Sequence, residues 1–263
     1  MKYENILLEI RNGVAHLTLN RPNAANGMNL DLCTELDAVS RSLDENDAVR
    51  AVLISGAGKL FCAGGDLKEF ATKGERELPH HLEDLVTHLH RAISRFARMR
   101  SPVIAAVHGS AAGAGMSLAC ACDLVVAAES ARFTMAYTRA GLTPDGSGSY
   151  FLPRIIGFRR ALELALLNPV LSAREANALG IVTRVVPDAE LMTNATALAE
   201  EIAQGPTLAY RGVKRLMLES ATSELDEQMG RETETICATS MTRDAREGIA
   251  AFLAKRPPKF TGQ

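Results

Sequence analysis

Residues 102–117 read PVIAAVHGSAAGAGMS and contain the stretch that decides the fold. Pro102 ends a preceding helical pattern, and Val103 to Val107 is an uncharged apolar run, as expected of a buried strand. The glycine-rich run from Gly109 to Gly115 follows, and a helix is predicted after it. A strand, a glycine-rich turn and a helix in this order are typical of an α/β core.

The same order of elements recurs on both sides of this stretch. Ala51 to Ile54 is an apolar strand that leads into a second glycine-rich turn, and Asp123 to Ala127 is a further strand. At the N-terminal end, two strand-like segments flank Asn12-Gly13, a favoured hairpin turn, and cover Ile6–Ile10 and Val14–Leu19. Two apolar stripes at helical spacing consist of Leu32, Leu36, Val39 and Leu43, and of Leu82, Leu85, Leu89, Ile93 and Phe96. We therefore predict an α/β core of repeated ββα units.

The sequence becomes mainly helical from about Arg159 onwards. Ser172 and Glu175 form a capping box that opens a short helix ending at Gly180, and a last strand is expected over 181–186. Further helices are expected near 189–203, 207–220, 223–240 and 242–254. No low-complexity linker separates the parts. We predict a core over 1–200 and a helical C-terminal subdomain over 201–263 that form a single functional unit.

Composition narrows the class of protein. The net charge is −2, so no basic field argues for nucleic acid or for an anionic membrane surface. No apolar stretch approaches the ~18 residues that span a bilayer, and the first residues lack the pattern of a signal peptide. The five cysteines are an odd number, which indicates reduced thiols and a cytoplasmic protein; they are Cys33, Cys62, Cys120, Cys122 and Cys237.

Both glycine-rich turns offer backbone amides to a ligand. The first is the segment from Phe61 to Leu67, FCAGGDL, and the second is Gly109 to Gly115. Amides at the start of a helix are unpaired and carry the positive end of its dipole. Two such turns that converge would hold a carbonyl oxygen that becomes negative during reaction. The alternative is that both are tight turns needed only for packing. Neither matches a dinucleotide fingerprint or a phosphate loop.

Five ordered segments together resemble the enoyl-CoA hydratase/isomerase (crotonase) superfamily along essentially the whole chain. They are 17–22, 61–67, 102–123, 173–186 and 246–256. The resemblance implies a spiral of repeated ββα units and a C-terminal helical subdomain for oligomerisation. The expected assembly is a homotrimer or a dimer of trimers.

The resemblance also implies the substrate and its binding residues. An acyl-CoA thioester would place its carbonyl between the amides of Gly65 and Ala114, and coenzyme A enters only as part of the substrate, with no other cofactor. Phe252 and Lys255 would approach coenzyme A from the C-terminal helix of the same or a neighbouring subunit. The remaining residues assigned to binding by motif position are Arg21, Ala25, Ala63, Asp66 and Leu67.

The hydratases of this superfamily use two glutamates, and neither is present here. The corresponding positions are Ser117 and Tyr137, which are not carboxylates able to act as a base near neutral pH. We expect Ser117 to be a small pocket residue and Tyr137 to line the acyl pocket with its hydroxyl directed at the substrate. Ordinary hydration is therefore disfavoured.

Asp145, in the segment TPDGSGS over 143–149, supplies a different carboxylate. Its position resembles that of the catalytic aspartate of phenylacetate-pathway ring-epoxide isomerases and of Δ3,Δ2-enoyl-CoA isomerases. We therefore predict an isomerase with Asp145 as acid and base. The local sequence alone also fits a helix N-cap at Asp145. Two other functions stay open: a hydratase in which Asp145 activates water, and a non-catalytic acyl-CoA-binding protein.

Four histidines lie within eleven residues, at His80, His81, His88 and His90. Their spacing lacks the convergent partners of a metal site, so no metal is predicted. His90 aligns with a catalytic histidine of aryl-CoA dehalogenases, whose nucleophilic aspartate corresponds to Asp145. A dehalogenase-like hydrolase is thus a further alternative. The absence of tryptophan and the pair Gly65-Asp66 favour the isomerase.

Overall fold

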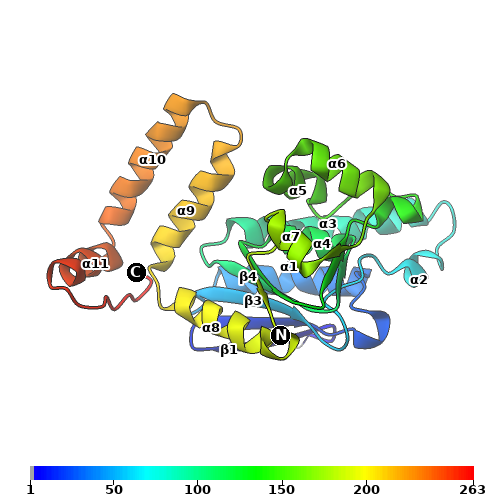
Figure 1. Ribbon diagram of the computed structural model, residues 1–263, viewed down its shortest axis with the longest axis horizontal. Helices are drawn as coiled ribbons and strands as arrows, with labels where there is room; N and C mark the ends of the chain where they lie inside the picture. The colour runs from blue at the N-terminus through cyan, green and yellow to red at the C-terminus, as the bar shows by residue number, and fades with distance from the viewer. Residues whose placement is uncertain (1–2) are drawn as a thin grey trace.

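A six-stranded sheet carries the core of the protein in this computed structural model, which describes residues 3–263 (Figure 1). Its strands lie in the order β1-β2-β3-β4-β6-β9. The first two are antiparallel across Asn12-Gly13, and the other neighbours are parallel. The strands are β1 (Ile6–Arg11), β2 (Val14–Leu19), β3 (Ala51–Gly56), β4 (Val103–Val107), β6 (Leu124–Ala128) and β9 (Arg184–Val186). The predicted hairpin and the predicted strands β3, β4 and β6 are confirmed.

A second, three-stranded sheet was not predicted. It contains β5 (Ser110–Ala112), β7 (Arg132–Thr134) and β8 (Leu171–Ser172). β5 lies inside the glycine-rich run from Gly109 to Gly115 and is only three residues long, so it has no periodicity that a sequence pattern could reveal. It continues directly into α4 (Ala114–Ala121).

α1 (Leu30–Asp44) and α3 (Leu78–Arg98) lie against each other, and their predicted apolar stripes are buried apart from the partly exposed Leu82. The shorter elements are η1 (Pro22–Ala24), α2 (Leu67–Phe70), η2 (Tyr137–Ala140), α5 (Gly148–Ile156), α6 (Phe158–Leu167), α7 (Ala173–Ala178) and η3 (Asp188–Glu190). The capping box of α7 is confirmed, with Ser172 and Glu175 bonded reciprocally.

Two predicted boundaries were wrong. The strand expected over 181–186 is shortened to β9, because the Asn177 side chain donates to the carbonyls of Val182 and Thr183 and so occupies the acceptors of a longer ladder. The helical region begins at Gly148, earlier than about Arg159. α5 contains Pro153, and a proline within a segment opposes a helix prediction.

The C-terminal helices separate into one that covers the sheet and three that extend from it (Figure 1). α8 (Leu191–Ala203) packs on β3, β4 and β6, whereas α9 (Thr207–Ser220), α10 (Leu225–Ser240) and α11 (Arg243–Leu253) lead away from the core. All four predicted helices are present. The predicted boundary between core and C-terminal subdomain, after residue 200, falls in the last turn of α8. The chain leaves the core in the connection between α8 and α9, at 204–206.

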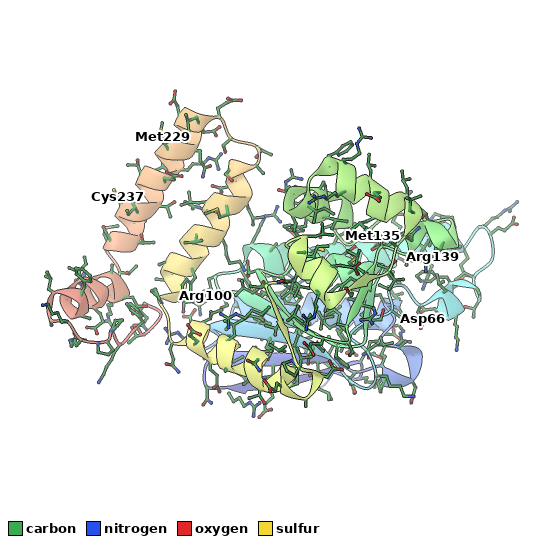
Figure 2. All side chains as sticks on the ribbon, in the orientation of Figure 1. Asp66, Arg100, Met135, Arg139, Met229 and Cys237 are labelled. Carbon is green, nitrogen blue, oxygen red and sulfur yellow. The ribbon has the colours of Figure 1, made fainter. Side chains whose placement is uncertain are left out.

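The extended helices leave apolar side chains uncovered. Figure 2 labels Met229 and Cys237 on α10, at a distance from the sheet. Large exposed apolar residues of this region are Val213, Met217, Leu225, Met229, Ile236, Met241, Ile249, Phe252 and Leu253. Within residues 3–263, no helix combines the length and apolar character that a membrane crossing requires.

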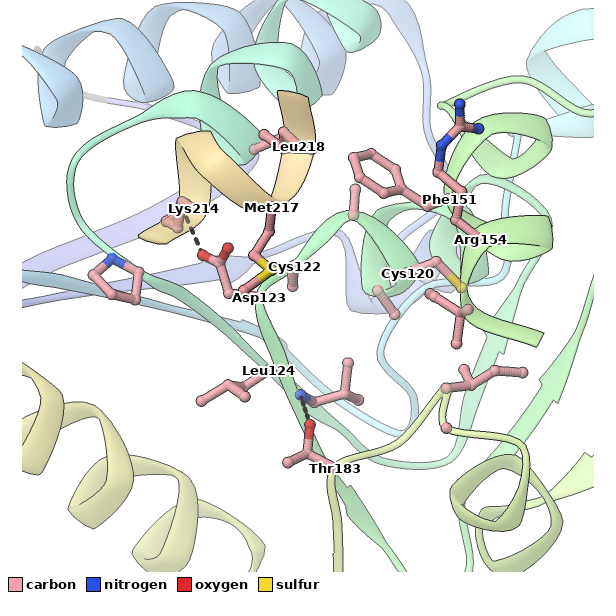
Figure 3. Close-up of a pocket in the computed structure, with 18 of the residues that line it drawn as sticks. Cys120, Cys122, Asp123, Leu124, Phe151, Arg154, Thr183, Lys214, Met217 and Leu218 are labelled. Atoms are coloured by element: carbon pink, nitrogen blue, oxygen red, sulfur yellow. Dashed lines mark hydrogen bonds and ion pairs between the residues drawn. The ribbon is translucent and has the colours of Figure 1, made fainter. Parts of the chain in front are cut away.

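A partly buried ion pair fastens α9 to the core (Figure 3). Lys214 Nζ lies 2.7 Å from Asp123 Oδ2 and also donates to the carbonyls of Phe96 and Ser101. Burial raises the pKa of Asp123 above its usual range, and the Lys214 ammonium opposes this effect. The pair closes one wall of an apolar cavity between α9 and the core.

We expect Lys214→Met to lower the free energy of unfolding by ~1–2 kcal/mol, because it leaves the partly exposed Asp123 carboxylate without its counter-charge and the carbonyls of Phe96 and Ser101 without this donor. Urea unfolding followed by circular dichroism measures this change. The control is the double variant Asp123→Asn/Lys214→Met, which removes both charges. Its free energy of unfolding should lie between those of the single variant and the wild type. A single variant within 0.5 kcal/mol of the wild type, on the order of a neutral surface change, would contradict this role.

Candidate active site

The two glycine-rich turns lie side by side. The Cys62 amide donates to the Ser110 carbonyl at 3.1 Å, and the Ala112 amide donates to the Cys62 carbonyl at 2.9 Å. A Cβ atom on Gly64, whose φ is +102°, would come within 3.0 Å of the Ala112 carbonyl oxygen. The close approach of the two backbones therefore requires glycine, and the two turns converge as the interpretation of an oxyanion hole requires.

Two unpaired amides face the space beside these turns. Gly65 and Ala114 both line a cavity, and in the part of the chain that the structure describes neither amide donates a hydrogen bond. Ala114 is the first residue of α4, where an amide has no partner within the helix. Gly113 precedes it at φ +51°, a conformation that turns the chain from β5 into α4. Two free amides beside one cavity suit an oxygen that develops negative charge.

The cavity encloses about 410 Å³ and has a mainly apolar wall. Most of the wall comes from α3 and from segments on either side of it, namely Leu67, Phe70, Leu82, Leu85, Val86, Leu89, Leu142 and Pro144. The sequence pattern identified three of these leucines only as a helical stripe. Nothing in that pattern separates side chains that fill the core from those that line a cavity.

Asp145 contributes the one carboxylate among the described residues that line this cavity. Its Oδ1 accepts a hydrogen bond of 2.6 Å from the Tyr137 hydroxyl. Burial raises the pKa of Asp145 above its usual range, while the Tyr137 hydrogen bond acts to lower it. The N-cap alternative was wrong, since Ser147 holds the N-cap position of α5 and the Asp145 side chain is bonded to Tyr137.

Tyr137 takes the position expected of it but not the expected orientation, and Ser117 lies outside the cavity wall. Tyr137 lines the cavity, but its hydroxyl is directed at Asp145. Ser117 does not reach the cavity wall; it is fully buried, and its hydroxyl lies 2.9 Å from that of Tyr137. The two positions where hydratases carry glutamates therefore form a hydrogen-bonded chain that ends on Asp145. Sequence reasoning missed this link because residues 117, 137 and 145 belong to three different elements.

His90 reaches the cavity from α3 and contacts the turn after Asp145. Its Nε2 accepts a hydrogen bond of 3.0 Å from the Gly146 amide. An amide that donates to Nε2 requires this nitrogen to be unprotonated, so the ring proton stands on Nδ1. In this arrangement His90 holds the turn, and its Nε2 is not free to take a proton from water.

Two other histidines of α3, His81 and His88, each lie beside a carboxylate. His81 Nε2 lies 3.1 Å from a Glu69 carboxylate oxygen, and His88 Nδ1 lies 3.1 Å from Asp37 Oδ2. Within residues 3–263, no group of three or more histidine, cysteine, aspartate or glutamate side chains is arranged to hold a metal ion.

The residues assigned to binding fall into two groups. Ala63 and Leu67 line the cavity, and Leu67 is exposed. Arg21 and Asp66 form an ion pair of 2.9 Å behind the wall, where Asp66 also caps α2. The Ala25 carbonyl accepts from the Ala63 amide at 3.0 Å. Arg21, Ala25 and Asp66 therefore order the first glycine turn, and they do not line the cavity.

Phe252 and Lys255 lie apart from this cavity in the same chain. Phe252 is on α11 with 83% of its surface exposed, and Lys255 follows the end of that helix. Neither residue lines the cavity that contains Asp145. If either residue contacts the substrate, it does so from another copy of the chain.

Comparisons with known proteins agree with this geometry. Residues 9–263 match the family described as enoyl-CoA hydratase/isomerase. The chain is 39% identical to 1,2-epoxyphenylacetyl-CoA isomerase from Escherichia coli, with 99% of each chain covered. It is 38% identical to a probable enoyl-CoA hydratase from Rhodobacter capsulatus over the whole of both chains.

A solved structure of similar fold is an enoyl-CoA hydratase from Bacillus anthracis. It superposes with a TM-score of 0.92 at 34% identity, covering 99% of this chain and 100% of that one. The predicted α/β fold with a helical C-terminal region is thereby confirmed. With two converging glycine turns and a match over nearly all its length, the chain belongs to the enoyl-CoA hydratase/isomerase family.

Proposed function

We propose that this protein is an acyl-CoA isomerase in which Asp145 moves a proton and the Gly65 and Ala114 amides stabilise a thioester enolate. The observation that carries the proposal is that two residues with unpaired amides and a single carboxylate line the same cavity. Other members of the family are named hydratases as well as isomerases, so the choice between the two reactions depends on the side chains of the cavity.

The proposed reaction begins with a 3-enoyl-CoA whose thioester oxygen accepts from both amides. The Asp145 carboxylate removes a proton from C2, and the electron pair moves into the carbonyl to form an enolate. The same carboxyl then returns the proton at C4, and the double bond lies between C2 and C3. The raised pKa of Asp145 makes it a stronger base than an exposed aspartate. Proton transfer of this kind needs no metal or redox cofactor.

Hydration is the second candidate, and it is less well supported. Adding water to a 2-enoyl-CoA requires one group to activate the water and one to deliver a proton to C2. Ser117 is hydrogen-bonded to Tyr137, and Tyr137 donates to Asp145, so Asp145 is the one carboxylate for both tasks. A dehalogenase-like reaction is also less well supported, because the Nε2 atom of His90 is already bonded to Gly146.

The cavity wall indicates the class of acyl group. Its side chains are mostly aliphatic, and Phe70 and Tyr137 supply the aromatic rings. This wall suits an aliphatic or alicyclic acyl chain. Because one relative is named 1,2-epoxyphenylacetyl-CoA isomerase, a ring-epoxide thioester of phenylacetate catabolism is a second substrate to test. The exposed apolar faces of α10 and α11 support a homotrimer or a dimer of trimers.

The purified protein should convert 3-hexenoyl-CoA into the 2-enoyl product and should hydrate crotonyl-CoA at least ~100-fold more slowly. Chromatography coupled to mass spectrometry separates the two products, because hydration adds the mass of water and isomerisation adds none. The ring-epoxide thioester is assayed in parallel. Efficient hydration of crotonyl-CoA with no isomerisation would overturn the proposal, and tight binding without turnover would favour a non-catalytic acyl-CoA-binding protein.

A further inference from the structure

A chain of hydroxyl groups ends on the carboxylate to which we assign proton transfer. The Tyr137 hydroxyl donates to Asp145 Oδ1 at 2.6 Å, and the Ser117 hydroxyl lies 2.9 Å from the Tyr137 oxygen. Tyr137 has a single hydroxyl proton, and it uses this proton in the hydrogen bond to the carboxylate. Ser117 must therefore be the donor to Tyr137, and the chain runs in one direction from Ser117 through Tyr137 to Asp145.

We infer that Tyr137, held by Ser117, is a positioning residue that fixes one oxygen of Asp145 and leaves the other oxygen to move the substrate proton. This inference rests on the proposed function of Asp145. A carboxylate that is held through one oxygen keeps a defined orientation of the other, and misplacement of a reacting group by about 1 Å costs ~100-fold in rate.

The packing around Ser117 indicates that this arrangement is built into the fold. A Cβ atom on Gly148 would lie 2.5 Å from the Ser117 Oγ, and one on Gly146 would lie 3.2 Å from the Ser117 Cβ. The turn after Asp145 therefore rests directly on Ser117, and glycine at 148 is what permits the contact. A larger side chain at 117, such as glutamate, would displace the turn and with it Asp145.

The charges and titratable groups around Asp145 are few. Tyr137 approaches from η2 and His90 from α3, and the buried thiols of Cys33 and Cys62 lie near enough for the Asp145 charge to act on them. Burial raises the pKa of Cys62 to about 12, and burial likewise raises the pKa of Cys33, so both thiols stay neutral. Burial and the Asp145 charge also raise the pKa of Tyr137, which therefore remains a donor.

The hydrogen bond from Tyr137 determines in which direction the pKa of Asp145 shifts when the hydroxyl is removed. The Tyr137 hydroxyl stabilises the ionised carboxylate, so it lowers the pKa that burial raises. Removal of this hydroxyl should raise the pKa of Asp145 further. The ionised form is the base, and activity should then be lost at a higher pH as the solution is acidified.

The test compares Tyr137→Phe with the wild type and with Tyr150→Phe, a matched control whose hydroxyl makes no hydrogen bond within the described residues. We expect Tyr137→Phe to lower kcat for 3-enoyl-CoA by ~10-fold to ~100-fold with KM changed less than ~3-fold. The acid limb of its pH–rate profile should move to higher pH. Ser117→Ala should move it in the same direction by less, and Tyr150→Phe should match the wild type.

A readout without substrate separates this inference from the proposed function. Titration of 13C-labelled aspartate carboxyls by NMR, with Asp145→Asn to assign the signal, reports the pKa of Asp145 directly. It should rise in Tyr137→Phe. An unchanged pKa together with an unchanged kcat would overturn the inference, as would a large rise in KM with an unchanged pH profile, which would mean that Tyr137 contacts the substrate instead.

Folding of each variant is checked by thermal unfolding. If Tyr137→Phe does not fold, the same comparisons are made with Ser117→Ala, which keeps the tyrosine but removes its donor. A wild-type pKa of Asp145 in that variant would then overturn the inference. If Asp145→Asn retains isomerisation, the proposed function fails whatever Tyr137 does.

Discussion

Asp145→Asn is expected to lower kcat for isomerisation of 3-hexenoyl-CoA by ~10²-fold to ~10⁴-fold, the range that a positioned general base contributes. The amide of asparagine is close in shape to the carboxyl and can still accept from the Tyr137 hydroxyl. The turn that follows residue 145 should therefore keep its place. The change removes the base and leaves the cavity, so kcat falls while KM stays within a few-fold of the wild type.

The matched control for this prediction is Asp84→Asn, on the exposed face of α3, where the aspartate makes no ion pair or side-chain hydrogen bond within the described residues. It removes the same charge without touching the cavity. Steady-state rates and binding of a saturated acyl-CoA are measured for both variants. Isomerisation at the wild-type rate by Asp145→Asn would mean that another group moves the proton, and His90 would be the next residue to test.

Asp145 also illustrates what the sequence could and could not predict about the site. Its position in the motif identified it as a candidate, whereas the local sequence TPDGSGS fitted a helix cap equally well. The choice depended on where its side chain pointed. That direction is set by Tyr137, eight positions earlier on η2, and by the packing of the glycine turn on Ser117.

The fold was predicted best where one element has a strong pattern of its own. The continuous apolar run of β4 and the stripe of α3 identify themselves because burial selects apolar residues at a fixed period. The three short strands of the second sheet carry no such period. They exist because β5 continues the close contact between the two glycine turns, which is a tertiary cause.

The binding residues show a similar division. Ala63, Gly65 and Ala114 line the cavity as their motif positions indicate. Arg21 and Asp66 belong to the same motifs, but their charges pair with each other behind the wall. A motif preserves the residues that shape a loop as well as those that touch a ligand, and a sequence pattern does not distinguish the two.

The second large effect is expected at the backbone of Ala114. Ala114→Pro removes one of the two unpaired amides beside the cavity. No other substitution at this position can do so, because only proline lacks the backbone N–H. Proline is tolerated at the first position of a helix, since the amide there has no helical partner and the fixed φ suits the helix. A proline also disfavours the α region for the residue that precedes it. That residue is Gly113, whose ψ of −125° lies outside the α region, so the proline meets no conflict there.

Loss of one oxyanion donor typically lowers kcat by ~10²-fold to ~10³-fold, or about 2.7–4 kcal/mol of transition-state stabilisation. We expect Ala114→Pro to show a loss of this size. Ala114→Gly is the control, because it keeps the amide and removes only the methyl group; its kcat should stay within ~5-fold of the wild type. Thermal unfolding checks that α4 is intact.

The proline ring also adds atoms beside the cavity, so bulk must be distinguished from the lost donor. A donor that acts mainly on the enolate lowers kcat and leaves binding of the ground-state thioester nearly unchanged. Calorimetry with a saturated acyl-CoA measures that binding for both variants. A large loss of binding with little change in kcat would indicate a blocked cavity. Wild-type kcat in a folded Ala114→Pro protein would show that the enolate oxygen is held elsewhere, and the amide of Gly65 alone could not then account for the stabilisation that the proposed reaction requires.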